Sequence, residues 1–529
     1  MVNRAEVEAW IADEVDPGAA AELQALLDAG AEAELGDRFA GPLTFGTAGL
    51  RGPLRAGPNG MNRTVVRRAA AGLAAWLAGQ GRIGEPVVVG YDARYGSTDF
   101  ARDSAAIFAA AGFKALLMPR VLPTPVLAFA VQHLGAAAGV MVTASHNPPQ
   151  DNGYKVYAAD GAQIVPPTDE QIEAAIRAVP SARGIPLVDD GVTVLGEDIV
   201  TAYVEAVAGL IGDGPRELRI VHTAMHGVGT ETVFAVLDRA GFADVLPVPE
   251  QELPDPDFPT VAFPNPEEPG ALDLALALAR DRHADIVIAN DPDADRCAVA
   301  VPLGRGGTKW RMLRGDELGV LLADAMMSAG ARGTYATTIV SSSMLGAMAE
   351  RHGAAYAETL TGFKWISRAA ADLVFGYEEA LGYAVAPDLV RDKDGISAAL
   401  RVAELAAALK AAGSSLLQRL DELAADYGRY ATDQVSVRVD DLSIIDTTMR
   451  RLRADPPLTL LGAPITVEDL LPDADVIRWR WPGGRVVVRP SGTEPKLKAY
   501  LEVVEPSGAA AAAADALGRL RTEVEALTS

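Results

Sequence analysis

The stretch ADIVIAND (residues 284–291) runs through apolar residues into an acidic loop, and it has two close counterparts in the chain. These are AAAGVMVTASHN (136–147) and ADLVFGYE (371–378), which also end in polar loops. Short apolar runs bounded by polar loops are typical of buried strands in α/β domains, although the pattern is common. Such folds bind ligands at the carboxyl ends of their strands. We therefore expect each of the three loops to carry function.

A second pattern also occurs three times: an apolar strand, a polar loop, a helical stretch and a glycine. The strands are expected at 87–90, 218–221 and 335–340, followed by the loops YDARYGST, HTAMHGVGTE and SSS, and by AGF (111–113), AGF (240–242) and HGA (352–354). A glycine favours the left-handed conformation that ends many helices. Together the two patterns predict an α/β protein with three similar domains built on mixed sheets.

The C-terminal part of the chain has a different pattern. The alternating runs VSVRV (435–439) and VIRWRW (476–481) favour a small α+β domain that closes with a helix over 509–527. A chain of 529 residues is long enough for three or four domains. We place the domain boundaries at 1–185, 186–305, 306–428 and 429–529.

Composition restricts the classes of partner. The formal net charge is −24 and the sequence pI is about 4.7, so we expect neither nucleic acid nor an anionic membrane as a partner. A small phosphorylated substrate requires Arg and Lys to gather in one site. Cys297 is the only cysteine, which excludes an internal disulfide. The first residues lack a secretory leader pattern, and we predict a cytoplasmic monomer or homodimer without a membrane span.

The loop NDPDADR presents three alternating carboxylates, Asp291, Asp293 and Asp295. Oxygen ligands at this spacing suit Mg²⁺ or Ca²⁺. An EF-hand needs Gly at position six and Glu at position twelve, where this chain has Arg296 and Pro302, so that alternative is excluded. An acidic turn held by its own side chains is the remaining alternative.

The loop TASHNPPQDNGYK follows a predicted strand and contains Ser145. An exposed Ser in a tight loop is a candidate nucleophile, and a nearby cation can polarise the phosphoryl group that it attacks. His146 and Lys155 are neighbouring groups able to move protons or to bind phosphate. The alternative is a Ser that only caps a turn.

Three further loops are candidates for substrate binding. RPSGTEPK (489–496) offers an Arg fork, hydroxyl groups and backbone N–H groups for a phosphate, and FGTAGLRG (45–52) adds Arg51. In YEEALGY (377–383), Glu378 and Glu379 can bind two sugar hydroxyls or can stand at a helix N-terminus. The sequence leaves these alternatives open.

Taken together and in this order, the four motifs TASHNP, DPDADR, YEEALGY and RPSGTEP resemble the α-D-phosphohexomutase family, over essentially the whole chain. The resemblance implies three similar α/β domains and a C-terminal domain like the TATA-binding-protein fold around a central cleft. It implies Mg²⁺ on Asp291, Asp293, Asp295 and a phosphorylated Ser145. It further implies a transfer site and substrate contacts formed by Arg51, His146, Lys155, Arg296, Thr361, Gly362, Lys364, Glu378, Glu379, Lys393, Arg489, Ser491, Gly492 and Thr493.

The implied reaction interconverts hexose 1-phosphate and hexose 6-phosphate through a 1,6-bisphosphate, with glucose 1,6-bisphosphate as activator and with domain closure on binding. TGFKWI (361–366) together with YEEALGY most resembles the branch of bacterial phosphoglucomutases and phosphopentomutases. Many members have Ser where this chain has Ala380, which removes one hydrogen-bonding group for the sugar. We rank glucose, mannose and pentose phosphates in that order. A sugar-bisphosphate synthase, a Ser-dependent metal phosphatase and a non-enzymatic sensor are the alternatives.

Overall fold

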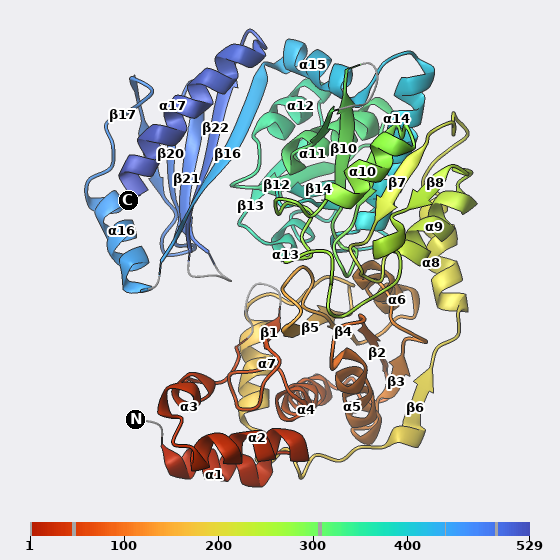
Figure 1. Cartoon of the computed structure of the whole chain (residues 1–529), viewed down its shortest axis with the longest axis vertical. Coiled ribbons are helices and arrows are strands. Elements are labelled where there is room, and N and C mark those ends of the chain that lie inside the picture. Colours follow the sequence, from red (N-terminus) through yellow and green to blue (C-terminus); the bar gives the residue numbers. More distant parts are fainter. Residues whose placement is uncertain (1–2, 45–48, 305–308, 440, 492–495, 529) are drawn as a thin grey trace. The chain divides into compact units, whose positions relative to one another are not determined.

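The computed structural model describes residues 3–44, 49–304, 309–439, 441–491 and 496–528 (Figure 1). The chain forms two compact units. The first contains residues 1–313 and 382–408, and the second contains 314–381 and 409–529. Residues 382–408 are grouped with the first unit by their contacts.

The first unit begins with three helices that precede the first sheet: α1 (Arg4–Asp13), α2 (Pro17–Asp28) and α3 (Glu32–Arg38). Their buried contacts centre on Val7, Leu23 and Leu35, which pack with Ala56.

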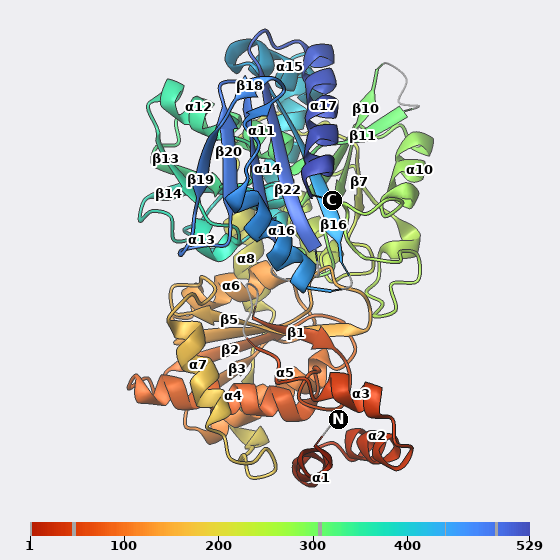
Figure 2. The ribbon, with the colours of Figure 1, turned by 90° about the vertical axis from the view of Figure 1, so that its left-hand side faces the viewer.

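The first sheet has six strands in the order β1-β5-β4-β2-β3-β6. Its elements are β1 (Leu50–Pro53), β2 (Pro86–Tyr91), β3 (Lys114–Leu117), β4 (Ala138–Val142), β5 (Asp151–Ala158), β6 (Val192–Val194), α4 (Arg63–Gly79), α5 (Ser97–Ala110), α6 (Thr124–His133), α7 (Thr168–Arg177) and α8 (Asp198–Ala208), with a 3₁₀ turn at Asp189–Gly191. Strand β2 pairs in parallel with β3 and β4, whereas β5 is antiparallel to β4 and β1. Figure 2 shows α5 and α6 on opposite faces of this sheet. The predicted mixed sheet is confirmed.

The second sheet has five strands in the order β11-β10-β9-β7-β8 and is also mixed. Its elements are β7 (Ile220–Thr223), β8 (Val245–Pro247), β9 (Ile286–Ala289), β10 (Ala298–Leu303), β11 (Lys309–Met312), α9 (Thr230–Arg239) and α10 (Asp273–Asp281), with a 3₁₀ turn at Pro249–Gln251. All four residues of β9 are buried, as expected for the apolar run that precedes the acidic loop. The unit also contains β15 (Gly382–Ala384) and most of α14 (Gly395–Ala411).

The second unit contains three strands of the third sheet, in which β12 (Thr334–Thr338) lies between β13 (Ala355–Thr359) and β14 (Leu373–Glu378) and pairs in parallel with both. Its helices are α11 (Gly315–Ser328), α12 (Met344–His352), α13 (Phe363–Ile366) and α15 (Leu416–Tyr427). Helix α12 ends at Gly353, whose φ of +64° is the left-handed conformation predicted for this position.

The C-terminal sheet is antiparallel, with the order β16-β22-β21-β20-β19. Its elements are β16 (Arg429–Arg438), β19 (Thr466–Asp469), β20 (Ile477–Trp481), β21 (Gly484–Pro490), β22 (Lys496–Glu505), the hairpin β17 (Thr459–Leu460) and β18 (Ala463–Pro464), α16 (Ser443–Ala454) and α17 (Ala510–Thr528). Helix α17 packs along β16 and β22 (Figure 2). The predicted fold class, three α/β domains followed by an α+β domain, is confirmed. No helix in the described ranges has both the length and the apolar character needed to cross a membrane.

Candidate active site

Ser145 lies in the loop between β4 and β5, with a positive φ of 52° that is uncommon for a residue with a side chain. Its backbone N–H donates to the Thr143 hydroxyl at 2.9 Å, which fixes the turn. The Ser145 Oγ donates to Asp291 Oδ2 at 2.8 Å and lies 3.2 Å from His146 Nδ1. The structure thus brings the Ser145 hydroxyl directly to the acidic loop that follows β9.

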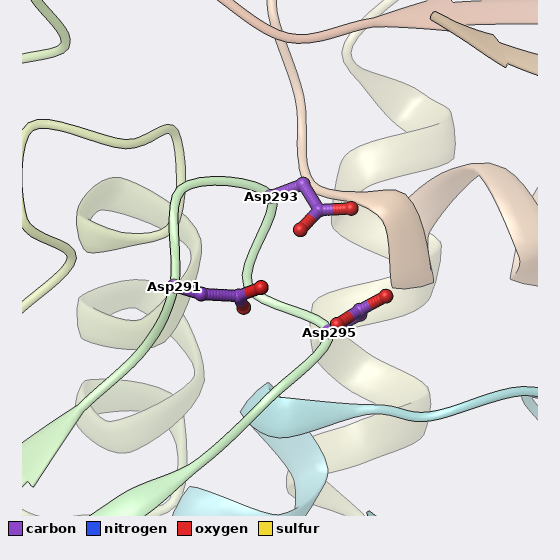
Figure 3. Close-up of side chains that lie close together, drawn as sticks. All are labelled: Asp291, Asp293 and Asp295. Carbon is purple, nitrogen blue, oxygen red and sulfur yellow. The ribbon is translucent and has the colours of Figure 1, made fainter. Parts of the chain in front are cut away.

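Asp291, Asp293 and Asp295 are completely buried, and one oxygen from each lies within 4.8 Å of the others (Figure 3). Asn290 closes the loop at its base by donating from Nδ2 to the backbone oxygen of Arg296 at 2.6 Å. Two oxygens, Asp293 Oδ1 and Asp295 Oδ1, are buried without a hydrogen-bond partner among the described residues. Buried carboxylate oxygens normally have partners, so this donor set fits a hard cation such as Mg²⁺.

Lys155 of β5 contacts two of these carboxylates, Asp293 Oδ2 at 2.7 Å and Asp295 Oδ2 at 2.9 Å. Burial alone would lower the pKa of Lys155, but the charges of Asp293 and Asp295 outweigh it and raise the pKa. Burial raises the pKa of Asp291 well above its usual value, and the other two aspartates add to this effect. Burial would also raise the pKa of Asp295, but Lys155 and Lys393 hold it below its usual range.

The predicted cations gather at the same place. Arg51 of β1 donates to Asn147 Oδ1 in the Ser145 loop at 2.9 Å, and the Arg296 backbone N–H donates to Asp291 Oδ1 at 3.1 Å. Burial, followed by the charges of Arg296 and Arg51, lowers the pKa of His146 well below its usual value. Arg and Lys side chains thus gather in one site, as binding of a phosphorylated substrate by this acidic protein requires.

Lys393 reaches this site from the segment between β15 and α14, with its Nζ 3.3 Å from Asp295 Oδ2. The neighbouring Asp392 accepts hydrogen bonds from Tyr157 at 2.8 Å and from Gln163 at 2.7 Å. These buried contacts fasten the segment to the first sheet.

Arg94 and Thr124 also contact the site, although no sequence motif indicated a role for either. Arg94 donates to the backbone oxygens of Ser145 and Asn147 at 2.6 Å, and to that of Pro148 at 2.7 Å. Thr124 Oγ1 donates to Asp293 Oδ2 at 2.6 Å. Arg94 stands in YDARYGST, one of the loops that follow a strand in the repeated pattern. That position could have identified it as a candidate site residue.

The second unit carries the other predicted residues. Glu379 accepts a hydrogen bond from Ser341 Oγ at 2.8 Å and a longer one from Thr338 at 3.3 Å. Gly362 has a φ of +110°, and the Lys364 Nζ lies 5.6 Å from the Trp365 ring centroid. Thr361 directly precedes Gly362, at the end of the segment after β13.

Tyr500 of β22 is a buried tyrosine of the same unit. Burial raises its pKa; the charges of Glu379 and Glu378 add to this, and Arg489, which hydrogen-bonds to it, opposes it. Ser491 follows β21, and its backbone N–H donates to the Lys496 oxygen at 2.8 Å. Gly492 and Thr493 lie outside the described residues.

Models of the phosphoglucomutase/phosphomannomutase family match the chain in four consecutive parts. These are α/β/α domain I at residues 42–183, domain II at 201–304, domain III at 314–427 and the C-terminal domain at 435–518.

Curated relatives carry the names of several phosphosugar mutases. The chain is 47% identical to a probable phosphomannomutase of Haemophilus influenzae, over 84% of this chain and 93% of that protein. It is 35% identical to a mouse phosphopentomutase (95% and 90% covered) and 34% identical to a phosphoglucomutase of Staphylococcus haemolyticus (88% and 91% covered). Among solved structures, a putative phosphomannomutase from Thermus thermophilus matches with a TM-score of 0.74 and 29% identity, covering 92% of this chain and 99% of that one.

The fold, the Ser145–aspartate geometry and these matches agree, and the chain belongs to the phosphoglucomutase/phosphomannomutase family of phosphosugar mutases.

Proposed function

We propose that the chain interconverts hexose 1-phosphates and hexose 6-phosphates through a phosphorylated Ser145, with glucose phosphate preferred and mannose phosphate second. The observation that carries this proposal is the 2.8 Å contact between the Ser145 hydroxyl and Asp291, one of three buried carboxylates. Asp291, Asp293 and Asp295 would hold Mg²⁺ together with a phosphoserine oxygen. The cation would neutralise negative charge on the phosphoryl group during transfer.

The residues around Ser145 suit each part of a phosphoryl transfer. The bond between phosphorus and Ser145 Oγ breaks while a bond forms to the 6-hydroxyl of the sugar, whose proton passes to a nearby base. His146, a neutral imidazole, can accept that proton, and Lys155, which is protonated, can donate one in the reverse transfer. Arg51, Arg296 and Lys393 supply the positive charge that stabilises the transferring group.

A 1,6-bisphosphate formed in this way must turn end for end before the second transfer. Its 1-phosphoryl group then returns to Ser145 and leaves the 6-phosphosugar. Glu378 would hold sugar hydroxyls, helped by Glu379, Thr361, Gly362 and Lys364. Arg489, Ser491, Gly492 and Thr493 would hold the phosphate that does not react. Glucose 1,6-bisphosphate would act as activator because it can phosphorylate Ser145.

A phosphopentomutase is the second candidate function. Two observations favour it: relatives named phosphopentomutase or phosphoribomutase match the chain at 35–40% identity, and Ala380 lacks a hydroxyl for the sugar. The same Ser145 chemistry would then act between the 1- and 5-positions of a pentose.

Phosphorus NMR tests both candidates directly. Glucose, mannose and ribose 1-phosphates are incubated separately with Mg²⁺ and catalytic glucose 1,6-bisphosphate. We expect conversion to the terminal phosphate, fastest for glucose, and none with Ser145→Ala. Faster turnover of ribose 1-phosphate would select the pentomutase.

Two other outcomes would overturn the mutase mechanism. Steady release of inorganic phosphate would indicate a phosphatase. Net accumulation of bisphosphate from an added phosphoryl donor would indicate a sugar-bisphosphate synthase.

A further inference from the structure

Each of the three α/β domains has a supporting loop after the first strand of its repeat, and this loop contacts the loop that carries the predicted chemistry. In the first domain, Arg94 in YDARYGST binds the backbone of the Ser145 loop. In the second, the Val228 N–H in HTAMHGVGTE donates to the Pro292 oxygen of the metal loop at 2.8 Å. A Cβ on Gly227 would lie 2.3 Å from the Pro292 Cα, so the two loops touch closely.

In the third domain the supporting loop is Ser341–Ser342–Ser343, which follows β12. The Ser341 hydroxyl accepts from the Glu379 N–H at 3.1 Å and donates to Glu379 Oε2 at 2.8 Å. One completely buried hydroxyl therefore fixes both the backbone and the side chain of the residue after Glu378. The loop after β12 therefore supports the sugar loop (residues 377–383), just as the corresponding loops of the other two domains support the Ser145 loop and the metal loop.

The same three serines are also held from the C-terminal sheet. Glu502 of β22 accepts from Ser342 Oγ at 2.8 Å, and from the Ser343 backbone N–H and hydroxyl, both at 2.9 Å. Arg485 of β21 donates to Glu502 at 2.8 Å and also to the Ser341 backbone oxygen.

Both charged residues are almost completely buried, with Glu502 3% and Arg485 5% exposed. A buried ion pair with its hydrogen bonds satisfied adds little net stability, but it fixes geometry because every alternative arrangement leaves a buried charge unpaired. Arg485 stands on the same strand as Arg489, the first residue of the predicted phosphate loop. The network thus joins that strand to the sugar loop.

We propose that Ser341, Arg485 and Glu502 are positioning residues that set the spacing between the sugar loop and Arg489 on β21. This inference rests on the proposed function, because it takes Glu378 and Arg489 as substrate contacts. A spacing role predicts that the network affects the affinity only of a ligand that must contact both loops. The affinity of a ligand that contacts one loop should not change.

Steady-state kinetics of Ser341→Ala and Glu502→Gln test this prediction. We expect KM for glucose 1-phosphate to rise about tenfold with kcat within about twofold, since uniform binding is lost. Inhibition by inorganic phosphate, which needs no sugar contact, should change by less than about twofold. Ser341→Thr, which keeps the hydroxyl, should restore KM.

A matched control separates positioning from simple stability. The buried Asp324 forms a bidentate pair with the half-buried Arg419 in the same unit, at 2.8 Å for both contacts, and neither hydrogen bond involves the three serines. Asp324→Asn should lower the thermal midpoint while leaving KM unchanged. If Ser341→Ala behaves in the same way, the positioning role is wrong. If Glu502→Gln does not fold, Ser341→Ala alone decides.

Glu378→Gln distinguishes the failure of this inference from that of the proposed function. If Glu378→Gln leaves KM unchanged, the assignment of the sugar loop is wrong. If Glu378→Gln raises KM while Ser341→Ala does not, only the positioning role is overturned.

Discussion

The predicted transfer site and the predicted sugar loop are held by different kinds of interaction: buried charges in the first and neutral hydrogen bonds in the second. Around Ser145 the side chains are buried charged groups, with Asp293 and Asp295 facing Lys155 and Lys393 at 2.7–3.3 Å. Around Glu379 the contacts come mainly from the neutral hydroxyls of Ser341 and Thr338. Charges buried close together are sensitive to any change of one partner, whereas neutral hydrogen bonds are worth about 1 kcal/mol each. The first site should therefore respond to substitution far more strongly than the second.

Asp291→Asn should produce the largest loss of activity. It removes one carboxylate from the predicted Mg²⁺ set, and we expect turnover to fall by about 10³-fold or more. The same change removes a buried charge that Asp293 and Asp295 oppose. In chelator at pH 8 the variant should consequently unfold at a temperature about 1–2 °C higher than the wild type. A lower midpoint without metal would contradict this description of the triad.

Lys155→Met tests the opposite charge at the same site. It leaves Asp293 without its buried cation and Asp295 with Lys393 alone, which should destabilise the metal-free protein by about 3–5 kcal/mol and reduce turnover by about 10²-fold. Thermal unfolding in chelator, followed by kinetics with Mg²⁺, measures both effects. Lys114→Met on β3 is the control, because Lys114 is exposed and should change neither quantity. An unfolding midpoint equal in the two variants would mean that the ion pair stabilises nothing.

The sequence predicts some parts of the transfer site and of the fold better than others. The alternating aspartates and the serine loop are local patterns, so their residues could be named without a structure. Lys393 could be named only through the family resemblance, and Arg94 was not predicted. Both come from distant segments, which the contacts of β5 with Asp392 and of the β2 loop with Ser145 bring to the site. The three α/β sheets could be predicted because strand, loop and helix repeat in order. The return of residues 382–408 to the first unit could not, because it is set by tertiary contacts such as that between Tyr203 and Asp394.

Asp316 is a buried carboxyl near the sugar loop whose ionisation affects stability. Burial, opposed by the hydrogen bond from the Ser342 N–H and assisted by Glu379 and Glu502, raises its pKa to about 7. Between about pH 4 and pH 7 the folded protein therefore binds a proton that the unfolded chain has released, so stability falls as pH rises through this range. Asp316→Asn should remove this contribution to the pH dependence, which is on the order of 3 kcal/mol in total. Thermal unfolding of both proteins at pH 4.5 and 7.5 measures it, and parallel shifts would refute it.

Ala380→Ser should have the smallest effect, and it addresses the sugar itself. The substitution places a hydroxyl two residues after Glu378, where many family members carry one. A single added hydrogen bond of about 0.5–1.5 kcal/mol changes a specificity ratio by about 2- to 10-fold. We expect kcat/KM for glucose 1-phosphate to rise relative to ribose 1-phosphate, with the overall rate little changed because Ser145 and the aspartates are untouched. Ala384→Ser, on β15 in the other unit, is a control for the added hydroxyl. If Ala380→Ser leaves the glucose-to-ribose ratio unchanged, the sugar does not contact this position, and its selection must come from residues such as Thr361 and Lys364.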